Sequence, residues 1–116
     1  MVVYFNGEYM PKASVHISPD DRGFLMADGV YEVVAATRGQ WFRLDAHLAR
    51  LARSMREIRL TGVEAASLEP VAAELLARND LNETTAKLYI QITRGVAPRH
   101  HDFPEGGVAP TVYATV

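Results

Sequence analysis

The segment from Ala86 to Arg94 places Leu88, Ile90 and Ile92 at every second position, separated by polar or amphipathic residues. Because successive side chains of a strand point to opposite faces, this alternation predicts a strand with one apolar face. Such a strand belongs to a sheet that a second layer covers on one side only. The rest of the chain must therefore supply that covering layer.

Three short segments near the N-terminus are also predicted from local pattern. Asn6-Gly7 favours a tight turn between strands at Val2–Phe5 and Glu8–Met10, which Pro11 ends. Val15 and Ile17 alternate with polar residues and predict a short edge segment. The segment from Phe24 to Gly29 is ambiguous and is interpreted as one helical turn closed by Gly29.

A second long strand is predicted from Val30 to Arg38, with a reversal at Gly39 and a return at Trp41–Leu44. Tyr31, Val33, Ala35 and Thr37 share one face of this strand, whereas Val30, Glu32, Val34 and Ala36 share the other. A last strand is predicted from Pro110 to Val116.

Two amphipathic helices are predicted between these strands. The first is expected to begin at Asp45, a suitable N-cap, and to run to about Arg59. The second is expected to begin at Ser67 and to end at Asn79 or Asp80. Their apolar stripes consist of Leu48, Leu51, Ala52, Met55 and Ile58 in the first helix, and of Leu68, Val71, Ala72, Leu75 and Leu76 in the second.

This order of strands, two helices and strands predicts an α+β fold: a mostly antiparallel sheet with two helices packed on one side. The 116 residues suffice for one domain, 1–116, with one core. Val116 ends the chain within a predicted strand, and we therefore expect more protein to follow.

Composition narrows the classes of function. The chain is 48% hydrophobic and 22% charged, with a net charge of -2, so no basic surface predicts nucleic-acid binding. The absence of cysteine excludes a disulfide framework and a thiolate zinc site. The N-terminus does not resemble a signal peptide, and no apolar run reaches the ~20 residues of a membrane span. We expect a cytoplasmic protein that binds no membrane.

The segment Thr93–Pro104 carries an unusual concentration of charge for a loop, centred on Arg99, His100 and His101. On an extended backbone Arg99 and His101 would point the same way and could bind one carboxylate or phosphate. The alternative is an ordinary polar loop exposed to solvent.

Other candidate residues have equally ordinary interpretations. Tyr31 could simply pack against the sheet, and Arg50 could lie on a solvated helix face. The four histidines show no spacing typical of a metal site, so none is predicted. No phosphate-binding glycine motif or nucleophile elbow is present. Lys12 and Lys87 are the only lysines, and nothing nearby indicates a catalytic role for either.

Four motifs, in this order and spacing, nevertheless resemble a known family. They are Asp21-Arg22-Gly23-Phe24, Asp28-Gly29-Val30-Tyr31-Glu32-Val33-Val34, Leu48-Ala49-Arg50-Leu51, and Thr93-Arg94-Gly95 continuing through Pro98-Arg99-His100-His101-Asp102-Phe103-Pro104. Together they are similar to the N-terminal domain of the class IV (fold type IV) pyridoxal-phosphate aminotransferases, in particular the D-amino-acid aminotransferases.

The resemblance implies a role for five residues. Arg50 would bind the phosphate of pyridoxal 5′-phosphate, and Val33 would form a wall beside the cofactor on the substrate side. Tyr31 would help to bind the substrate carboxylate. Arg99 and His101 would complete this carboxylate trap from the neighbouring subunit, which implies a homodimer.

The same resemblance implies that catalytic parts are absent. The family's Schiff-base lysine belongs to a C-terminal domain, so this segment has no catalytic residue and should be inactive alone; whether it binds the cofactor by itself stays open. The complete enzyme would transfer an amino group from a D-amino acid such as D-alanine to a 2-oxo acid such as 2-oxoglutarate. Alternatives are an aminodeoxychorismate lyase or a branched-chain aminotransferase of the same family, or a stand-alone, non-catalytic domain that binds anions or self-associates.

Overall fold

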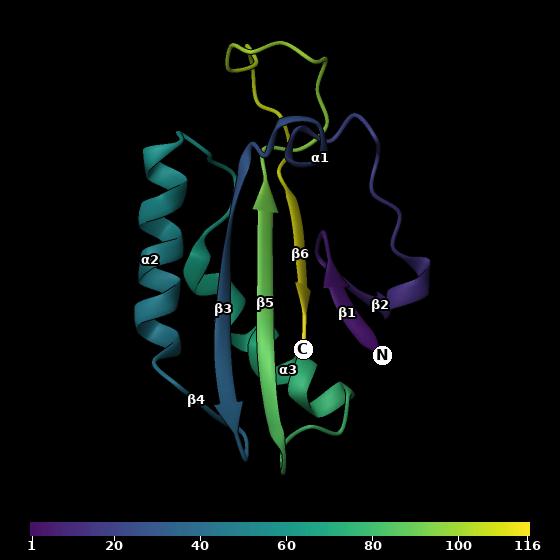
Figure 1. The fold of residues 1–116 in the computed structure, drawn as a ribbon, viewed down its shortest axis with the longest axis vertical. Helices are drawn as coiled ribbons and strands as arrows, with labels where there is room; N and C mark the ends of the chain where they lie inside the picture. The colour runs from purple at the N-terminus through teal and green to yellow at the C-terminus, as the bar shows by residue number, and fades with distance from the viewer.

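The computed structural model describes residues 1–116 as a single twisted sheet with helices on one face (Figure 1). The strands are β1 (Val2–Phe5), β2 (Glu8–Pro11), β3 (Gly29–Thr37), β4 (Gln40–Trp41), β5 (Thr85–Thr93) and β6 (Thr111–Thr115). Their order across the sheet is β2-β1-β6-β5-β3-β4, and every pairing is antiparallel. The predicted α+β fold is confirmed.

Two longer helices form the second layer, α2 (Leu44–Glu57) and α3 (Glu69–Arg78) (Figure 1). A short helix, α1 (Arg22–Met26), lies at the end of the sheet where β3 begins and β5 ends. Two 3-10 turns, Lys12–Ser14 and Ala65–Leu68, complete the regular structure.

The core lies between the sheet and the two helices, as the one-sided alternation of β5 requires. Leu88, Ile90 and Ile92 are buried and form one cluster with Leu51 of α2 and Leu75 of α3. The opposite face of the sheet is not covered by any helix. Tyr31 and Val33 lie on this open face and are 63% and 44% exposed. The structure thus leaves one face of β3 and β5 available for other contacts.

Several predicted boundaries were wrong for local reasons. Val15 and Ile17 form no strand, because the chain leaves the hairpin through the 3-10 turn at Lys12–Ser14. The turn from Phe24 is instead the helix α1, which Ala27 closes in a left-handed conformation (φ 55°) two residues before Gly29.

The helix starts also differ from the prediction. Asp45 does not cap α2; Arg43, in a left-handed conformation, precedes the helix, and Asp45 lies in its first turn, where a negative charge still favours the helix dipole. Ser67 does not cap α3; its hydroxyl donates to the Glu64 carbonyl inside a 3-10 turn, and α3 begins at Glu69. These corrections move boundaries and leave the architecture unchanged.

The segment from Arg94 to Pro110 connects β5 to β6 and rises beyond the end of the sheet (Figure 1). Its first turn depends on Gly95, which has a φ of 96° and lies against the backbone of Ala109. A side chain here would collide with the Ala109 carbonyl oxygen. Gly106, in the same connection, also has a positive φ (83°) but lies in open space. A substitution at Gly106 would cause backbone strain alone, whereas a substitution at Gly95 would cause both strain and a steric collision.

Replacement of Gly95 by Ala should destabilise the protein by about 2–5 kcal/mol, because backbone strain and collision add. Gly106→Ala is the matched control and should cost only about 1–2 kcal/mol, from strain alone. Urea denaturation of both variants measures the difference. Equal losses would show that the close approach of Gly95 to Ala109 does not constrain the connection.

Candidate functional site

A groove of about 780 Å³ lies on the open face of the sheet. Its floor includes three tyrosines from adjacent strands: the rings of Tyr31 and Tyr89 are 6.2 Å apart, and those of Tyr89 and Tyr113 are 6.4 Å apart. The Tyr89 hydroxyl donates to the Gln91 side-chain oxygen at 2.5 Å. Burial, and then the neighbouring Tyr113 and Tyr31, raise the pKa of Tyr89, so its hydroxyl stays protonated. The groove thus combines aromatic surface with hydroxyl groups.

Glu32 follows Tyr31 in β3 but points to the opposite, covered face and is 3% exposed. Its carboxylate accepts two hydrogen bonds from Arg50 of α2, from Nε at 2.6 Å and from Nη2 at 2.6 Å. It also accepts a bond from His47 Nδ1 at 2.7 Å. The bond from Arg50 lowers the pKa of Glu32, burial opposes this, and the bond from His47 adds to the lowering. Glu32 is therefore ionised and fixes both side chains of α2.

The guanidinium of Arg50 is only partly paired within the chain. Its Nη1 makes no hydrogen bond within the chain, and the side chain is 56% exposed. It lines a shallow pocket of about 280 Å³ with Phe42, Arg43, Ala46 and His47. An arginine that is held on one edge and free on the other suits a phosphate dianion. The residues present therefore fit one contact to a phosphate group.

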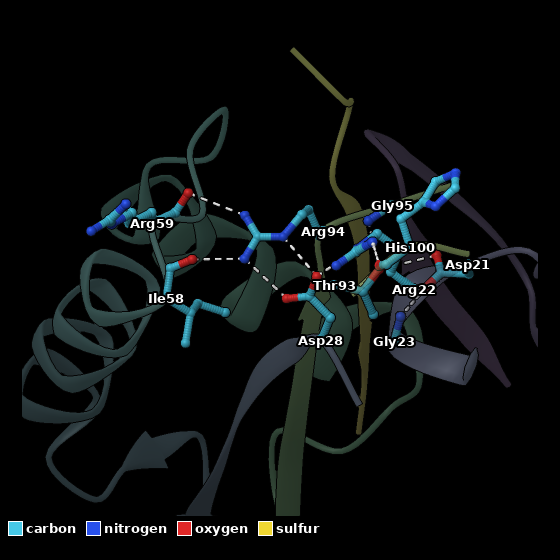
Figure 2. Close-up of polar contacts among 10 residues, drawn as sticks. All are labelled: Asp21, Arg22, Gly23, Asp28, Ile58, Arg59, Thr93, Arg94, Gly95 and His100. Atoms are coloured by element: carbon cyan, nitrogen blue, oxygen red, sulfur yellow. Dashed lines mark hydrogen bonds and ion pairs between the residues drawn. The ribbon is translucent and has the colours of Figure 1, made fainter. Parts of the chain in front are cut away.

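A second ionic cluster lies where α1, β3 and β5 meet (Figure 2). Asp28 accepts from Arg22 Nε at 2.7 Å and from Arg94 Nε and Nη2 at 2.7 and 3.0 Å. Burial alone would raise the pKa of Asp28, but the bonds from Arg94 and Arg22 outweigh it and hold this pKa below its ordinary value. The cluster is an ionised triad, with two buried arginines around a mostly buried carboxylate, at the base of the connection between β5 and β6.

Asp21 reinforces the same corner. Its carboxylate is buried and accepts bonds from the Gly23 amide at 2.8 Å and from the hydroxyls of Thr93 and Thr111 at 3.0 and 2.6 Å. These bonds join the start of α1 to the end of β5 and the start of β6. The two chain segments that enter and leave the charged connection are thereby fixed.

Arg99 and His101 lie in this connection and are exposed. Neither side chain makes a hydrogen bond or an ion pair within the chain. The extended backbone on which their predicted common direction depended is absent, because the His100 amide donates to the Pro98 carbonyl at 2.9 Å and closes a three-residue turn around Arg99. The argument from alternation was therefore wrong here.

The structure brings some of the predicted site residues together and leaves others apart. Tyr31 and Val33 share the open face of β3. Arg50 of α2 contacts the same strand on its covered face, where it donates to Glu32. Gly29 pairs with Thr93, so the connection that carries Arg99 and His101 starts at the sheet end nearest Tyr31. Within the chain, no hydrogen bond links Arg99 or His101 to Tyr31.

Sequence reasoning missed Glu32, Asp28 and the partners that they hold. A signal was present for Glu32, because a lone carboxylate between Val30 and Val34 on the covered face of a strand requires a cationic partner. No such signal was present for Asp28, because Arg22 and Arg94 reach it from segments far apart in the sequence.

Known proteins resemble this chain in sequence and in fold. The family model described as amino-transferase class IV matches residues 29–116. D-alanine aminotransferase from Staphylococcus haemolyticus is 40% identical over 113 residues, which are 97% of this chain and 39% of that protein. Among solved structures, 4-amino-4-deoxychorismate lyase from Pseudomonas aeruginosa has a TM-score of 0.78 at 25% identity, over 97% of this chain and 38% of that one. Branched-chain amino acid aminotransferase from Escherichia coli has a TM-score of 0.87 at 19% identity, over 98% and 39%.

The fold is thus that of the fold type IV transaminases over their N-terminal part. This chain belongs to the class IV aminotransferase family, and the resemblance inferred from its motifs is confirmed. It spans about 39% of the length of the curated relatives that it matches. None of its helices has both the length and the apolar character that a bilayer crossing requires.

The lowered pKa values of Glu32 and Asp28 predict how stability depends on pH. Protonation of either carboxylate costs more in the folded than in the unfolded state, so the stabilisation is complete above the ordinary value of about 4 and is lost as the pH falls through the lowered value. The free energy of unfolding should decline below about pH 5.

Glu32→Gln should cost about 1–3 kcal/mol at pH 7 and make that decline shallower, because one of the two carboxylates no longer titrates. Glu83→Gln is the control, since Glu83 is exposed and makes no hydrogen bond or ion pair. Urea denaturation between pH 3 and pH 7 measures both. A pH dependence of Glu32→Gln identical to that of the unmodified protein would contradict the assignment.

Proposed function

We propose that this chain is the N-terminal portion of a pyridoxal-phosphate-dependent D-amino-acid aminotransferase. The observation that carries the proposal is the 40% identity to a D-alanine aminotransferase, which extends over nearly the whole of this chain. Its substrates would be a D-amino acid such as D-alanine and a 2-oxo acid such as 2-oxoglutarate. A cytoplasmic homodimer, to which each subunit contributes residues for its neighbour, is part of the same proposal.

The catalytic lysine would lie in a C-terminal domain beyond the part of the relatives that this chain matches. Within the 116 residues, Lys12 and Lys87 are both exposed, and neither makes a hydrogen bond or ion pair with its side chain. We assign neither of them a catalytic role. The segment alone is therefore expected to be inactive.

Arg50 is the residue that would hold the cofactor phosphate, because its Nη1 is free while Glu32 holds its Nε and Nη2. When bound, pyridoxal phosphate supplies an electron sink that makes the α-proton of an amino acid acidic. Glu32 orients Arg50, and its negative charge keeps the guanidinium ionised. Val33, on the open face beside Tyr31, would exclude water from one side of the cofactor.

The carboxylate of the substrate would be bound by three groups. The Tyr31 hydroxyl lies on the open face of the sheet and can donate one hydrogen bond. Arg99 and His101 are exposed and have no partner within the chain, so they are free to reach the substrate of a neighbouring subunit. A guanidinium and an imidazole that share one carboxylate would fix the orientation of the α-carbon substituents.

Two other activities of the same family remain candidates on specific grounds. The 4-amino-4-deoxychorismate lyase is similar to this chain in fold and is 25% identical to it in sequence. The branched-chain aminotransferase is similar in fold, but its sequence identity is only 19%. The stand-alone, anion-binding or self-associating domain is the alternative outside enzymology. The Arg99 and His101 pair favours recognition of a small carboxylate by an aminotransferase.

The full-length protein should form D-glutamate from D-alanine and 2-oxoglutarate, whereas the isolated 116 residues should not. Chiral chromatography of the products measures this activity. The matched substrates are L-leucine with 2-oxoglutarate, and 4-amino-4-deoxychorismate without a 2-oxo acid. Faster turnover of either one would contradict the D-amino-acid assignment, and turnover of none would favour the non-catalytic alternative.

Arg99→Ala and Arg50→Ala should separate the two binding roles in the full-length protein. Loss of charge-assisted hydrogen bonds to the substrate should raise the KM for D-alanine roughly 10- to 150-fold in Arg99→Ala, with cofactor affinity nearly unchanged. Arg50→Ala should instead weaken cofactor affinity by a similar factor. Steady-state kinetics and titration with pyridoxal phosphate measure the two quantities. Equal loss of both in Arg99→Ala would contradict its role.

A further inference from the structure

One carboxylate, that of Asp28, holds two guanidinium groups in the buried corner below the charged connection (Figure 2). Arg22 is 2% exposed, and Arg94 is also buried. Asp28 accepts from only three of the nitrogens of these two guanidinium groups. The remaining buried N–H donors require further acceptors, because their desolvation is otherwise unfavourable.

The first of these acceptors lies in the connection itself. Arg22 Nη1 donates to the backbone carbonyl of His100 at 2.8 Å, while its Nε stays on Asp28 (Figure 2). This carbonyl belongs to the peptide unit between His100 and His101, and Arg99 lies one residue earlier. A bond to it from a buried arginine fixes the backbone from which both Arg99 and His101 project.

The other acceptors are reached by Arg94. Its Nη2 and Nη1 donate to the carbonyls of Ile58 and Arg59 at 2.7 and 3.2 Å, just beyond the C-terminal end of α2, where free carbonyls favour a cation. The ring of Phe103 covers the same guanidinium, with 4.4 Å from its Cζ to the ring centroid. The connection is thus held at a second point, two residues after His101.

We propose that Arg22 and Arg94, both anchored on Asp28, are positioning residues for substrate recognition. They hold the connection between Arg99 and His101, through the His100 carbonyl, and two residues after His101, through the ring of Phe103. This inference rests on the proposed function, since it assigns the held loop to the substrate carboxylate. Neither arginine touches the substrate; each acts through the backbone that carries the carboxylate-binding side chains.

Two variants of the full-length protein test the proposal without removing the buried carboxylate. Arg22→Lys keeps a positive charge beside Asp28 but replaces the two nitrogens that reach Asp28 and His100 by one. Phe103→Ala removes the second contact at a half-exposed position, where it leaves no buried charge without a partner. Arg78→Lys is the matched control, because Arg78 pairs with Glu74 and covers Tyr9 in the same manner on α3, outside the connection.

The readouts are steady-state kinetics with D-alanine and hydrogen exchange of the Ala97 and His100 amides, which are the amides of residues 97–103 that donate backbone hydrogen bonds. Both test variants should exchange roughly tenfold faster in this segment, with the β5 amides unchanged. The KM for D-alanine should rise about tenfold in Arg22→Lys, with kcat within about twofold of the unmodified enzyme and cofactor affinity unchanged. Arg78→Lys should alter none of these quantities.

Comparison with Arg99→Ala distinguishes failure of this inference from failure of the proposed function. If Arg99→Ala raises KM while Arg22→Lys and Phe103→Ala leave it unchanged, the positioning role is wrong and the proposed function stands. If Arg99→Ala itself leaves KM unchanged, the loop does not bind the substrate, and both the carboxylate assignment and the positioning role are wrong. Unchanged exchange in both test variants would also overturn the positioning role.

Discussion

The carboxylate of Asp28 is the point on which the end of the sheet, the end of α2 and the charged connection depend together. Asp28 immediately precedes β3, whose first residue, Gly29, pairs with Thr93 of β5. Through Arg94 it is linked to the carbonyls of Ile58 and Arg59 just beyond the end of α2, and through Arg22 to the carbonyl of His100. The Asp28 carboxylate accepts hydrogen bonds from two guanidinium groups. Its neutralisation would therefore weaken the bonds of both Arg22 and Arg94, so the three regions that these arginines join are coupled.

The two faces of β3 carry different candidate site residues. Tyr31 and Val33 face open space, whereas Glu32, between them in sequence, faces α2 and fixes Arg50 and His47. The alternation of a strand therefore places the exposed Tyr31 next to the carboxylate that orients Arg50. The face that carries Tyr31 and Val33 is the one that no helix covers.

The alternation of β3 and β5 and the two apolar helix stripes sufficed to predict the architecture, because these patterns report burial directly. The starts of α2 and α3 were mispredicted, because Asp45 and Ser67 have the right chemistry for a cap but the adjacent turns decided where each helix begins. The roles of Tyr31, Arg50, Arg99 and His101 came from the resemblance alone and remain predictions. Asp28 could not have been found by spacing, since its partners come from α1 and from the end of β5.

The side chains of Arg99 and His101 are exposed, but the backbone that carries them is held in place by buried arginines. A loop that must order on binding loses conformational entropy at that moment, which weakens affinity by about 0.5–1.5 kcal/mol for each immobilised side chain and more when backbone is ordered as well. Here the backbone at His100 and the ring of Phe103 are held by buried arginines, so much of that ordering is completed during folding. Under the proposed function, only the side chains of Arg99 and His101 would remain to be ordered by the substrate carboxylate. The triad and the exposed pair would then act together, because folding has already ordered the backbone from which the two side chains project.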